Sequence, residues 1–312
     1  MASFLSRKNF CFKTYRKLVM NEYNQLPIFC INLDRSKDRW QKMKDQELTL
    51  NGPKIERIPA VDGYIMDKGE LLKQNKITPL CYNICSAGMI GCWLSHLKVW
   101  KKVVDNKLPY AIVLEDDAEF PTDYKNKIKN LMPFIPENAD IVLLGCAAGC
   151  RESEDLNFLE KSLGLFYKPR DFAIINQEII IPRMFIGSYA YIITQQGAQK
   201  CINLFSKTHY HIDHEISRNP NINLYSVRKK DEWFKTTAFS NSSTLNGNNN
   251  SYQKENKFLN NDFSLKWLLD APIAELPFGL TINAWLIIKI IFIILIFLLL
   301  KWFFKKPIFN KK

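Results

Sequence analysis

Residues 108–119, LPYAIVLEDDAE, decide the fold of this chain. A run of five apolar or aromatic residues, YAIVL, leads directly into three carboxylates, Glu115, Asp116 and Asp117. A short continuous run of this kind predicts a strand that is buried on both faces of a sheet, with the acids at its carboxyl end. Because side chains alternate between the faces of a strand, Glu115 and Asp117 are predicted to share one face and Asp116 to occupy the other.

Two carboxylates on the same face repel each other. At a separation of about 6 Å and an effective dielectric constant of about 20, the repulsion is roughly 3 kcal/mol. A divalent cation with oxygen ligands would relieve it, so the acid cluster is a candidate metal site. The alternative is that the acids only end the strand and cap the segment that follows, and the rest of the chain has to decide between the two.

Strands alternate with helices along the chain. Apolar runs predict strands at 28–33, 55–63, 141–144 and 189–193, and a helical pattern covers 195–205. This alternation predicts an α/β fold with a mostly parallel sheet flanked by helices, which binds ligands at the carboxyl ends of its strands. Residues 64–85 are polar and predicted to be irregular.

Polar side chains follow the first two of these strands. Asn32, Arg35 and Arg39 come after the first, and an Asp62-Gly63 pair predicts a tight turn with positive φ after the second. The first turn has no glycine-rich motif, which disfavours a dinucleotide-binding dehydrogenase. The asparagine and arginines could instead contact a nucleotide through their side chains, or simply form a solvated helix start.

An amphipathic helix is predicted from Ser86 onwards, with Ser86 as its N-cap and with Trp93 and Trp100 on the buried face. Gly91 lowers helix stability by about 1 kcal/mol relative to alanine, so it is expected to permit close approach of backbone or ligand. His96 lies beside the tryptophans. It is either a core histidine or part of the donor site.

Three of the four histidines gather in HYHIDHEI, residues 209–216. If this stretch is extended, His209, His211 and Asp213 share one face, and a zinc site is conceivable there. A hydrogen-bonded loop, or an acid close to the substrate, explains the cluster equally well. Asp213 is the first candidate for a general base and Glu215 the second.

Composition excludes little. The net charge is +12, but residues 280–312 hold six lysines and no acid, which leaves +6 on the rest. An excess of this size without a basic and aromatic stripe does not favour nucleic-acid binding, and it suits a small anionic substrate. The eight cysteines show neither a disulfide framework nor zinc-type pairs. Cys30, Cys92 and Cys146 are expected to be buried thiols, which favours a reducing compartment.

Residues 280–304 are almost entirely apolar, interrupted by Asn283 and Lys289. A helix of about 25 residues spans the roughly 30 Å of a bilayer core, so we predict one transmembrane helix, with an interfacial anchor as the alternative. The basic tail favours a cytoplasmic C-terminus, whereas the absence of a recognisable leader favours a cytoplasmic N-terminal domain. The membrane face of the catalytic domain therefore stays open.

Four blocks, INLDRSKDRW, IPAVDG, GMIGCWLSHLKVWKKVV and AIVLEDDAEF, resemble glycosyltransferase family 25 in their order and spacing. The resemblance also takes in GSYAYIITQQGAQKC and the later Asp213. It implies a GT-A-like α/β fold, a nucleotide-diphosphate-sugar donor such as UDP-galactose, and Mn²⁺ or Mg²⁺ at the acidic motif. The motif here reads EDD, whereas the family pattern is DxD. The resemblance would place Glu115, Asp116 and Asp117 at the metal and diphosphate, and Asn32, Arg35, Arg39, Asp62 and Gly63 at the donor.

The chain is thus predicted to consist of a basic arm (1–26), a catalytic domain (27–240), a linker (241–279), a transmembrane helix (280–304) and a basic tail (305–312). The predicted function is a membrane-anchored glycosyltransferase that moves a sugar onto a glycan, lipid-linked or protein acceptor, with galactose as the first candidate for that sugar. Two other classes stay open: another metal-dependent phosphoryl enzyme, and a non-catalytic glycan-binding membrane protein.

Overall fold

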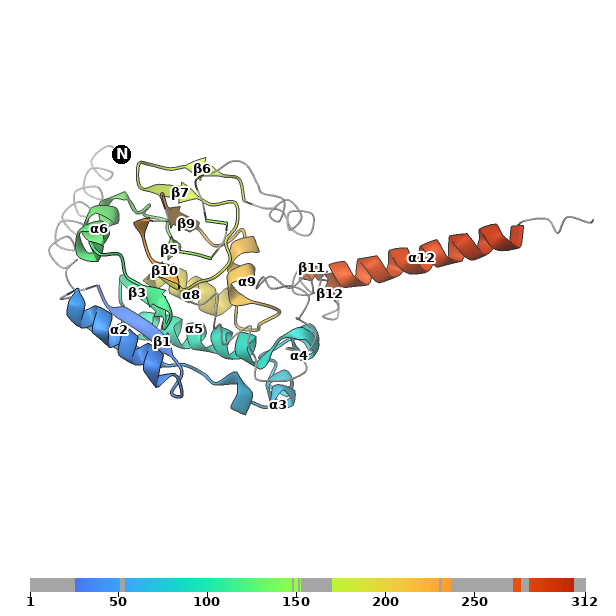
Figure 1. Ribbon diagram of the computed structural model, residues 1–312, viewed down its shortest axis with the longest axis horizontal. Coiled ribbons are helices and arrows are strands. Elements are labelled where there is room, and N and C mark those ends of the chain that lie inside the picture. Colours follow the sequence, from blue (N-terminus) through green and yellow to red (C-terminus); the bar gives the residue numbers. More distant parts are fainter. Residues whose placement is uncertain are drawn as a thin grey trace, which may run out of the picture.

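The described residues of the computed structural model form an eight-stranded mixed sheet with helices on both faces (Figure 1). They are residues 26–50, 54–147, 149–150, 152, 170–229, 232–236, 272–275 and 281–305. Nearly all of the predicted basic arm, most of the linker and most of the basic tail lie outside these residues. The strands are β1 Ile28–Asn32, β2 Ile55–Pro59, β3 Tyr110–Glu115, β4 Ala118–Glu119, β5 Ile141–Gly145, β6 Ala173–Ile174, β7 Ile179–Ile181, β8 Ala190–Thr194, β9 Leu224–Val227, β10 Lys235–Thr236, β11 Pro272–Glu275 and β12 Thr281–Asn283.

Helices of different lengths connect the strands. Among the described residues, the α-helices and short 3₁₀ turns are α2 Lys37–Thr49, η2 Gly63–Ile65, α3 Lys68–Lys73, α4 Pro79–Ile84, α5 Ala87–Asp105, α6 Tyr124–Leu131, η3 Met132–Phe134, α8 Gln195–Leu204, α9 Ile212–Arg218 and α12 Ala284–Lys305.

The sheet corrects the prediction of mostly parallel strands. The strand order is β2-β1-β3-β8-β5-β9-β7-β6. Among the described strands, β1 is parallel to β2 and to β3, and β5 is parallel to β9, whereas the other neighbouring pairs are antiparallel. Strand β8 lies between β3 and β5 and runs opposite to both. The apolar run of β8 indicates that both faces of the strand are buried. A central antiparallel strand is buried in the same way as a parallel one, so the pattern could not give the direction of β8.

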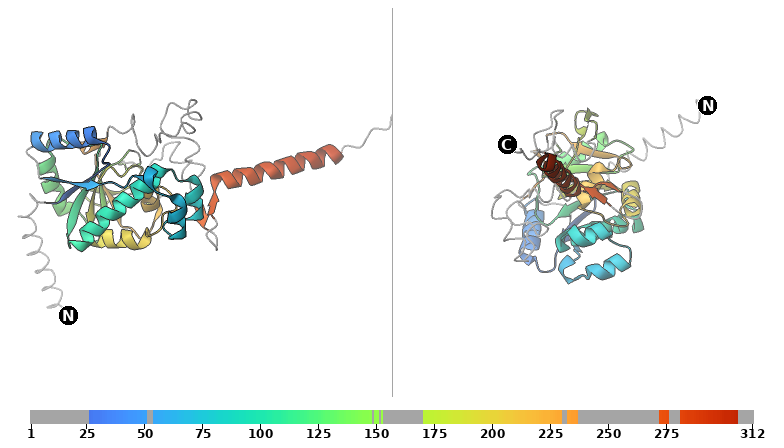
Figure 2. Two further views of the ribbon diagram at one scale, coloured as in Figure 1. Left: turned by 90° about the horizontal axis from the view of Figure 1, so that it is seen from below. Right: turned by 90° about the vertical axis from the view of Figure 1, so that its right-hand side faces the viewer.

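Each face of the sheet packs its own layer of helices, as the left view of Figure 2 shows for α2 and α5. On one face, Met43 of α2 and Ile128 of α6 pack with Ile112 of β3. On the other face, Trp93 and Trp100 of α5 pack with the strand residues whose side chains point to that side of the sheet. The predicted doubly buried strand β3 is confirmed, since its residues 111–114 are all fully buried.

Two glycines hold the loop after β2 against the first turns of α5. A Cβ on Gly63 would lie 1.7 Å from the Ala87 carbonyl oxygen, and one on Gly91 would lie 2.6 Å from the Val61 carbonyl oxygen. The expected close approach at Gly91 is therefore confirmed, and the partner is backbone. The prediction of a positive φ at Gly63 is wrong. Glycine is needed there because a Cβ would clash with the backbone of α5.

Residues 64–85 were predicted to be irregular, and the structure corrects this. Asp67 caps α3 by accepting hydrogen bonds from the backbone N–H groups of Gly69 and Glu70. Thr78 caps α4 by accepting from the N–H of Cys81, and Pro79 occupies the first position of that helix. These capping signals were present in the sequence, although the helices are too short to show an apolar period.

The cysteines also differ in part from expectation. Cys146 is paired with Cys150 rather than being a buried thiol, and Cys81 is paired with Cys85. Cys30 is a free, buried thiol, as predicted, whereas Cys92 is free but only partly buried. Each disulfide joins residues four apart, which is too local a spacing to form a recognisable framework in the sequence.

The C-terminal segment forms α12, which projects away from the rest of the molecule (Figure 1). A helix was predicted here, and that part is confirmed. Within the described part of the chain, however, no helix combines the length and the apolar character that crossing a membrane requires. The predicted transmembrane helix over 280–304 is therefore not supported.

Candidate functional site

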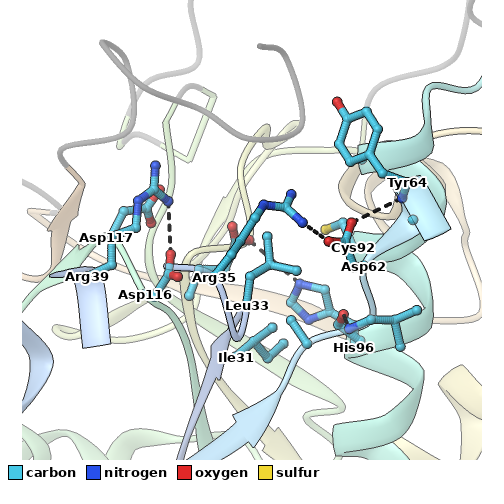
Figure 3. Close-up of a pocket in the computed structure, with 16 residues that line it drawn as sticks. Ile31, Leu33, Arg35, Arg39, Asp62, Tyr64, Cys92, His96, Asp116 and Asp117 are labelled. Carbon is cyan, nitrogen blue, oxygen red and sulfur yellow. Dashed lines mark hydrogen bonds and ion pairs between the residues drawn. The ribbon is translucent and has the colours of Figure 1, made fainter. Parts of the chain in front are cut away.

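A cavity lies at the carboxyl ends of β1, β2 and β3, where it is bordered by the first half of α5 (Figure 3). Parallel strands bring their carboxyl ends to the same edge of a sheet, and this is why residues from 31 to 117 meet here. The lining comprises Ile31, Leu33, Arg35, Arg39, Ala60, Val61, Asp62, Gly63, Tyr64, Gly88, Cys92, Ser95, His96, Glu115, Asp116 and Asp117.

Asp116 is held by two donors from the β1–α2 region. Its Oδ2 accepts a hydrogen bond of 2.8 Å from Asn32 Nδ2, and its Oδ1 accepts one of 2.9 Å from Arg39. Burial raises the pKa of Asp116, and the bonds from Arg39 and Asn32 oppose that rise. Asn32 is itself buried and accepts from Arg57 Nε at 2.7 Å, so it positions Asp116 from beneath the cavity.

Asp117 has the most unfavourable environment of the three acids. Its Oδ1 is buried without a hydrogen-bond partner. Burial, followed by the charges of Glu115 and Asp116, raises the pKa of Asp117 from 3.8 to about 7. An orphaned carboxylate oxygen among like charges is what a divalent cation with oxygen ligands would satisfy, so the donor set fits Mn²⁺ or Mg²⁺.

Glu115 is the last residue of β3 and faces α5. Its Oε1 accepts a bond of 3.3 Å from Ser188 Oγ and lies 3.6 Å from His96 Nε2. Because the strand ends at Glu115 and the next two acids lie in a turn, strand alternation does not decide which way Asp116 and Asp117 point. The three acids thus meet three different environments.

Arg35 and Asp62 form an ion pair across the mouth of the cavity (Figure 3). The guanidinium of Arg35 also lies 5.5 Å from the centre of the Tyr64 ring. Asp62 accepts a hydrogen bond of 3.1 Å from the backbone N–H of Tyr64. A guanidinium paired with one carboxylate and close to an aromatic ring can exchange that partner for a phosphate.

His96 is buried at the base of the cavity, with 1% of its surface exposed. Its Nδ1 shares a hydrogen bond of 2.8 Å with the Tyr191 hydroxyl, which also accepts from Trp100 Nε1 at 2.9 Å. The ring is therefore a core residue on its Nδ1 side, and it also lines the cavity. Its part in a donor site stays a prediction.

The two predicted base candidates lie in different places. Asp213 accepts a hydrogen bond of 2.7 Å from the N–H of Gly187. The next residue, Ser188, donates a hydrogen bond to Glu115, so Gly187 and Ser188 connect the two acids. Glu215 Oε1 accepts from the N–H groups of His209 and Tyr210 at 2.7 and 2.6 Å.

Burial raises the pKa of Glu215 to about 7, and the two backbone bonds oppose that rise. Glu215 borders a separate cavity with His209 and Arg218. The structure brings Asp213 towards the acid cluster and does not bring Glu215 there.

The histidine segment is not extended, because α9 begins at Ile212, directly after His211. The face-sharing that suggested a zinc site is therefore absent. In the part of the chain with described side chains, the histidines 209, 211 and 214 do not belong to a group with metal-ligand spacing.

Sequence reasoning missed three contributors to the site. Arg57 orients Asn32 from β2, and Ser95 Oγ accepts a bond of 2.8 Å from the N–H of Val61, which fixes the loop after β2. Cys92 lines the cavity, although the sequence suggested only a buried thiol. Its position one helical turn before His96 was the available signal.

A mixed α/β sheet with acids and arginines at the carboxyl ends of its parallel strands has the architecture of an α/β enzyme that binds its ligand at that edge of the sheet. The profile of glycosyltransferase family 25, described as an LPS biosynthesis protein, matches residues 25–216. Since that match covers more than half of the sequence, the chain belongs to glycosyltransferase family 25.

Curated relatives are similar over parts of this region. Mouse procollagen galactosyltransferase 2 is 36% identical over 115 residues, which are 34% of this chain and 18% of that protein. Zebrafish (Danio rerio) procollagen galactosyltransferase 1 is 27% identical over 188 residues, 56% of this chain and 28% of that protein. A human relative named inactive glycosyltransferase 25 family member 3 is 27% identical over 129 residues, 38% of this chain and 21% of that protein. The chain thus matches less than a third of the length of each of these relatives.

Proposed function

We propose that this chain transfers a sugar from a UDP-sugar to a hydroxyl group of a glycan, lipid-linked or protein acceptor, with galactose as the first candidate for that sugar. The single observation that carries the proposal is the cavity in which Asp116, Asp117, Arg35 and Arg39 converge at the ends of adjacent strands. The family membership and the relatives named procollagen galactosyltransferases support the choice of reaction and of sugar.

The arginines suit the diphosphate of the donor. Arg39 is held by Asp116, and Arg35 by Asp62, so both guanidinium groups are positioned before the donor arrives. A planar guanidinium matches the geometry of phosphate oxygens and keeps its charge at any physiological pH. Tyr64 beside Arg35 offers an aromatic face on which a base could stack.

The metal proposed at this site is Mn²⁺ or Mg²⁺, held by Asp117 and Glu115. Asp116 is less available than Asp117, because both of its oxygens already accept hydrogen bonds. When bound, such an ion neutralises the negative charge that develops on the departing diphosphate. The chain itself contributes the two arginines, whose positive charge would also stabilise the departing diphosphate.

An acceptor hydroxyl has to lose its proton during transfer, and Asp213 is the first candidate to take it. The N–H of Gly187 fixes the orientation of its carboxylate, and the neighbouring Ser188 contacts Glu115. Glu215 is disfavoured for this role, since its Oε1 already accepts several hydrogen bonds in a different cavity.

The test is a panel of nucleotide sugars offered to the purified full chain, with and without a chelator. Transfer from a UDP-sugar that is lost with the chelator and in Asp117→Asn is the expected result. Asp105→Asn, an exposed acid at the end of α5, is the matched control and should keep full activity. If Asp117→Asn transferred sugar at the normal rate, the assignment of the site would be wrong.

The same panel separates the two other functions. Hydrolysis of phosphoesters without sugar transfer would favour a phosphoryl enzyme, and UDP-sugar binding without turnover would favour a non-catalytic binding protein. Location at a membrane stays a prediction from the sequence, which fractionation of cells expressing the full chain would test.

A further inference from the structure

A thiol, an imidazole and a carboxylate meet at the base of the cavity. Cys92 and His96 are four residues apart on α5, so they project from the same face of that helix (Figure 3). Glu115 reaches them from the end of β3. Their ligand atoms all lie within 4.8 Å of one another. Within the residues that the structure describes, this is the one group of His, Cys, Asp and Glu residues with that spacing.

His96 Nε2 is the most informative atom of the group. It is buried and has no hydrogen-bond partner, and it lies 3.6 Å from Glu115 Oε1. That distance is too long for a hydrogen bond. Two ligand atoms on one tetrahedral zinc ion are about 3.4 Å apart, given metal–ligand distances of about 2.0 to 2.2 Å. The pair is therefore spaced as two ligands of a single ion.

The other ring nitrogen of His96 is already engaged. Nδ1 lies 2.8 Å from the Tyr191 hydroxyl, and the ring of His96 stacks on the Tyr191 ring with the centroids 5.7 Å apart. A hydroxyl oxygen has two lone pairs, so that of Tyr191 can accept from both Trp100 and His96 Nδ1–H. A histidine ligand commonly donates its second N–H in this way, which leaves Nε2 unprotonated towards the metal.

The charge around Cys92 also favours a cation. Burial, followed by the carboxylates of Glu115, Asp213 and Asp117, raises the pKa of the Cys92 thiol. The same three carboxylates would attract a divalent ion to this position. Asp116 is not part of this group, since Arg39 and Asn32 hold both of its oxygens.

We propose that Cys92, His96 and Glu115 bind one divalent ion of the zinc class, with a fourth coordination position left for water or a donor oxygen. A set of sulfur, nitrogen and oxygen ligands selects zinc or cobalt, whereas oxygen ligands alone select magnesium or manganese. On binding, the Cys92 thiol loses its proton to the buffer and its sulfur bonds to the metal as a thiolate. Because Glu115 is shared, an ion here withdraws that carboxylate from the metal proposed for the donor.

Cobalt is the probe for the test. The purified full chain is stripped of metal with a chelator and titrated with Co²⁺, and the near-ultraviolet thiolate-to-cobalt absorption band is followed. One equivalent should produce the band. Cys92→Ser should lose it, and His96→Gln should bind Co²⁺ at least about 100-fold more weakly, because loss of an outer-shell partner alone already weakens metal binding by about 10- to 100-fold. Cys201→Ala, at another free and buried cysteine, is the matched control and should keep the band.

Two further measurements keep the proposal testable if a variant fails to fold. Zinc should protect Cys92 of the unmodified chain against alkylation, read by peptide mass. Calorimetry in buffers of different ionisation enthalpy should show about one proton released per ion.

Asp117→Asn should lose sugar transfer but keep the cobalt band, which separates this site from the proposed function. A missing band, or a band that persists in Cys92→Ser, would show that no such ion binds at Cys92, His96 and Glu115.

Discussion

Asp117→Asn should raise the stability of the metal-free protein while it abolishes transfer. In the folded chain the pKa of Asp117 is about 7, compared with 3.8 as its ordinary value, because the carboxylate is buried beside Glu115 and Asp116. That difference corresponds to about 4 kcal/mol of free energy between the protonated and the ionised forms. The charge on Asp117 is therefore costly in the fold, and asparagine does not carry it.

The pH dependence of this effect has a definite direction. Between pH 4 and 7 the folded protein keeps a proton on Asp117 that the unfolded chain has already lost, so stability falls as the pH rises through this range. Below pH 4 the carboxyl group is neutral in both states, and the variant and the natural protein should unfold at nearly the same urea concentration. Above pH 7 the variant should be more stable by up to about 4 kcal/mol.

The assay is urea unfolding at pH 4, 6 and 8 with chelator present, with Asp105→Asn as the control for removal of an exposed acid. Adding Mn²⁺ at pH 8 should stabilise the natural protein and leave Asp117→Asn unchanged, since only the former has the full ligand set. A stability difference that is constant with pH, or that favours the natural protein at pH 8 without metal, would refute the reasoning.

Three other outcomes are expected. Gly91→Ala should lower the unfolding free energy by about 1 to 3 kcal/mol, because its Cβ would meet a backbone carbonyl oxygen at 2.6 Å. Gly69→Ala on α3 is the control that should be tolerated, and thermal melts compare the two variants. Arg39→Gln should weaken UDP binding in calorimetry by at least about tenfold, because Asp116 loses its charged partner and the donor loses a guanidinium. Glu215→Gln should stabilise the protein at pH 8 but not at pH 4, since burial raises the pKa of this carboxyl to about 7; urea unfolding without this pH dependence would contradict it.

The elements that could be predicted from sequence are those with strong local signals. The doubly buried strand β3 and the Ser86-capped helix α5 follow from apolar patterning and one side-chain hydrogen bond, and both are confirmed. The direction of β8 could not be predicted, because its pattern reports burial and not the neighbour it pairs with. The helices α3 and α4 were missed because six residues are too few to show a period.

The site divides in the same way. Placing Arg39 and Asp62 at the cavity needed only the rule that parallel strands end together, and the structure puts both there. The role of Asn32 beneath Asp116, and the approach of Cys92 to Glu115, depend on contacts between residues more than twenty positions apart. The first contact is fixed by the pairing of β1 with β3 and the second by the packing of α5 on the sheet, and no local sequence pattern reports either.

The three consecutive acids differ in the charges and ligand atoms that surround each carboxylate. Asp116 has its counter-charge within the chain, since Arg39 lies 2.9 Å from it. Glu115 faces His96 and Cys92, so it meets a soft ligand set. Asp117 has an orphaned Oδ1, and the charges of Glu115 and Asp116 act on it with only partial compensation from Arg39, so a bound cation would stabilise its ionised form. Loss of Asp116 should therefore release Arg39 and disturb the fold locally, whereas loss of Asp117 should relieve repulsion and remove a metal ligand. One EDD motif thus contains a structural ion pair beside the acid that we propose as a cation ligand, and its sequence of like charges does not distinguish the two.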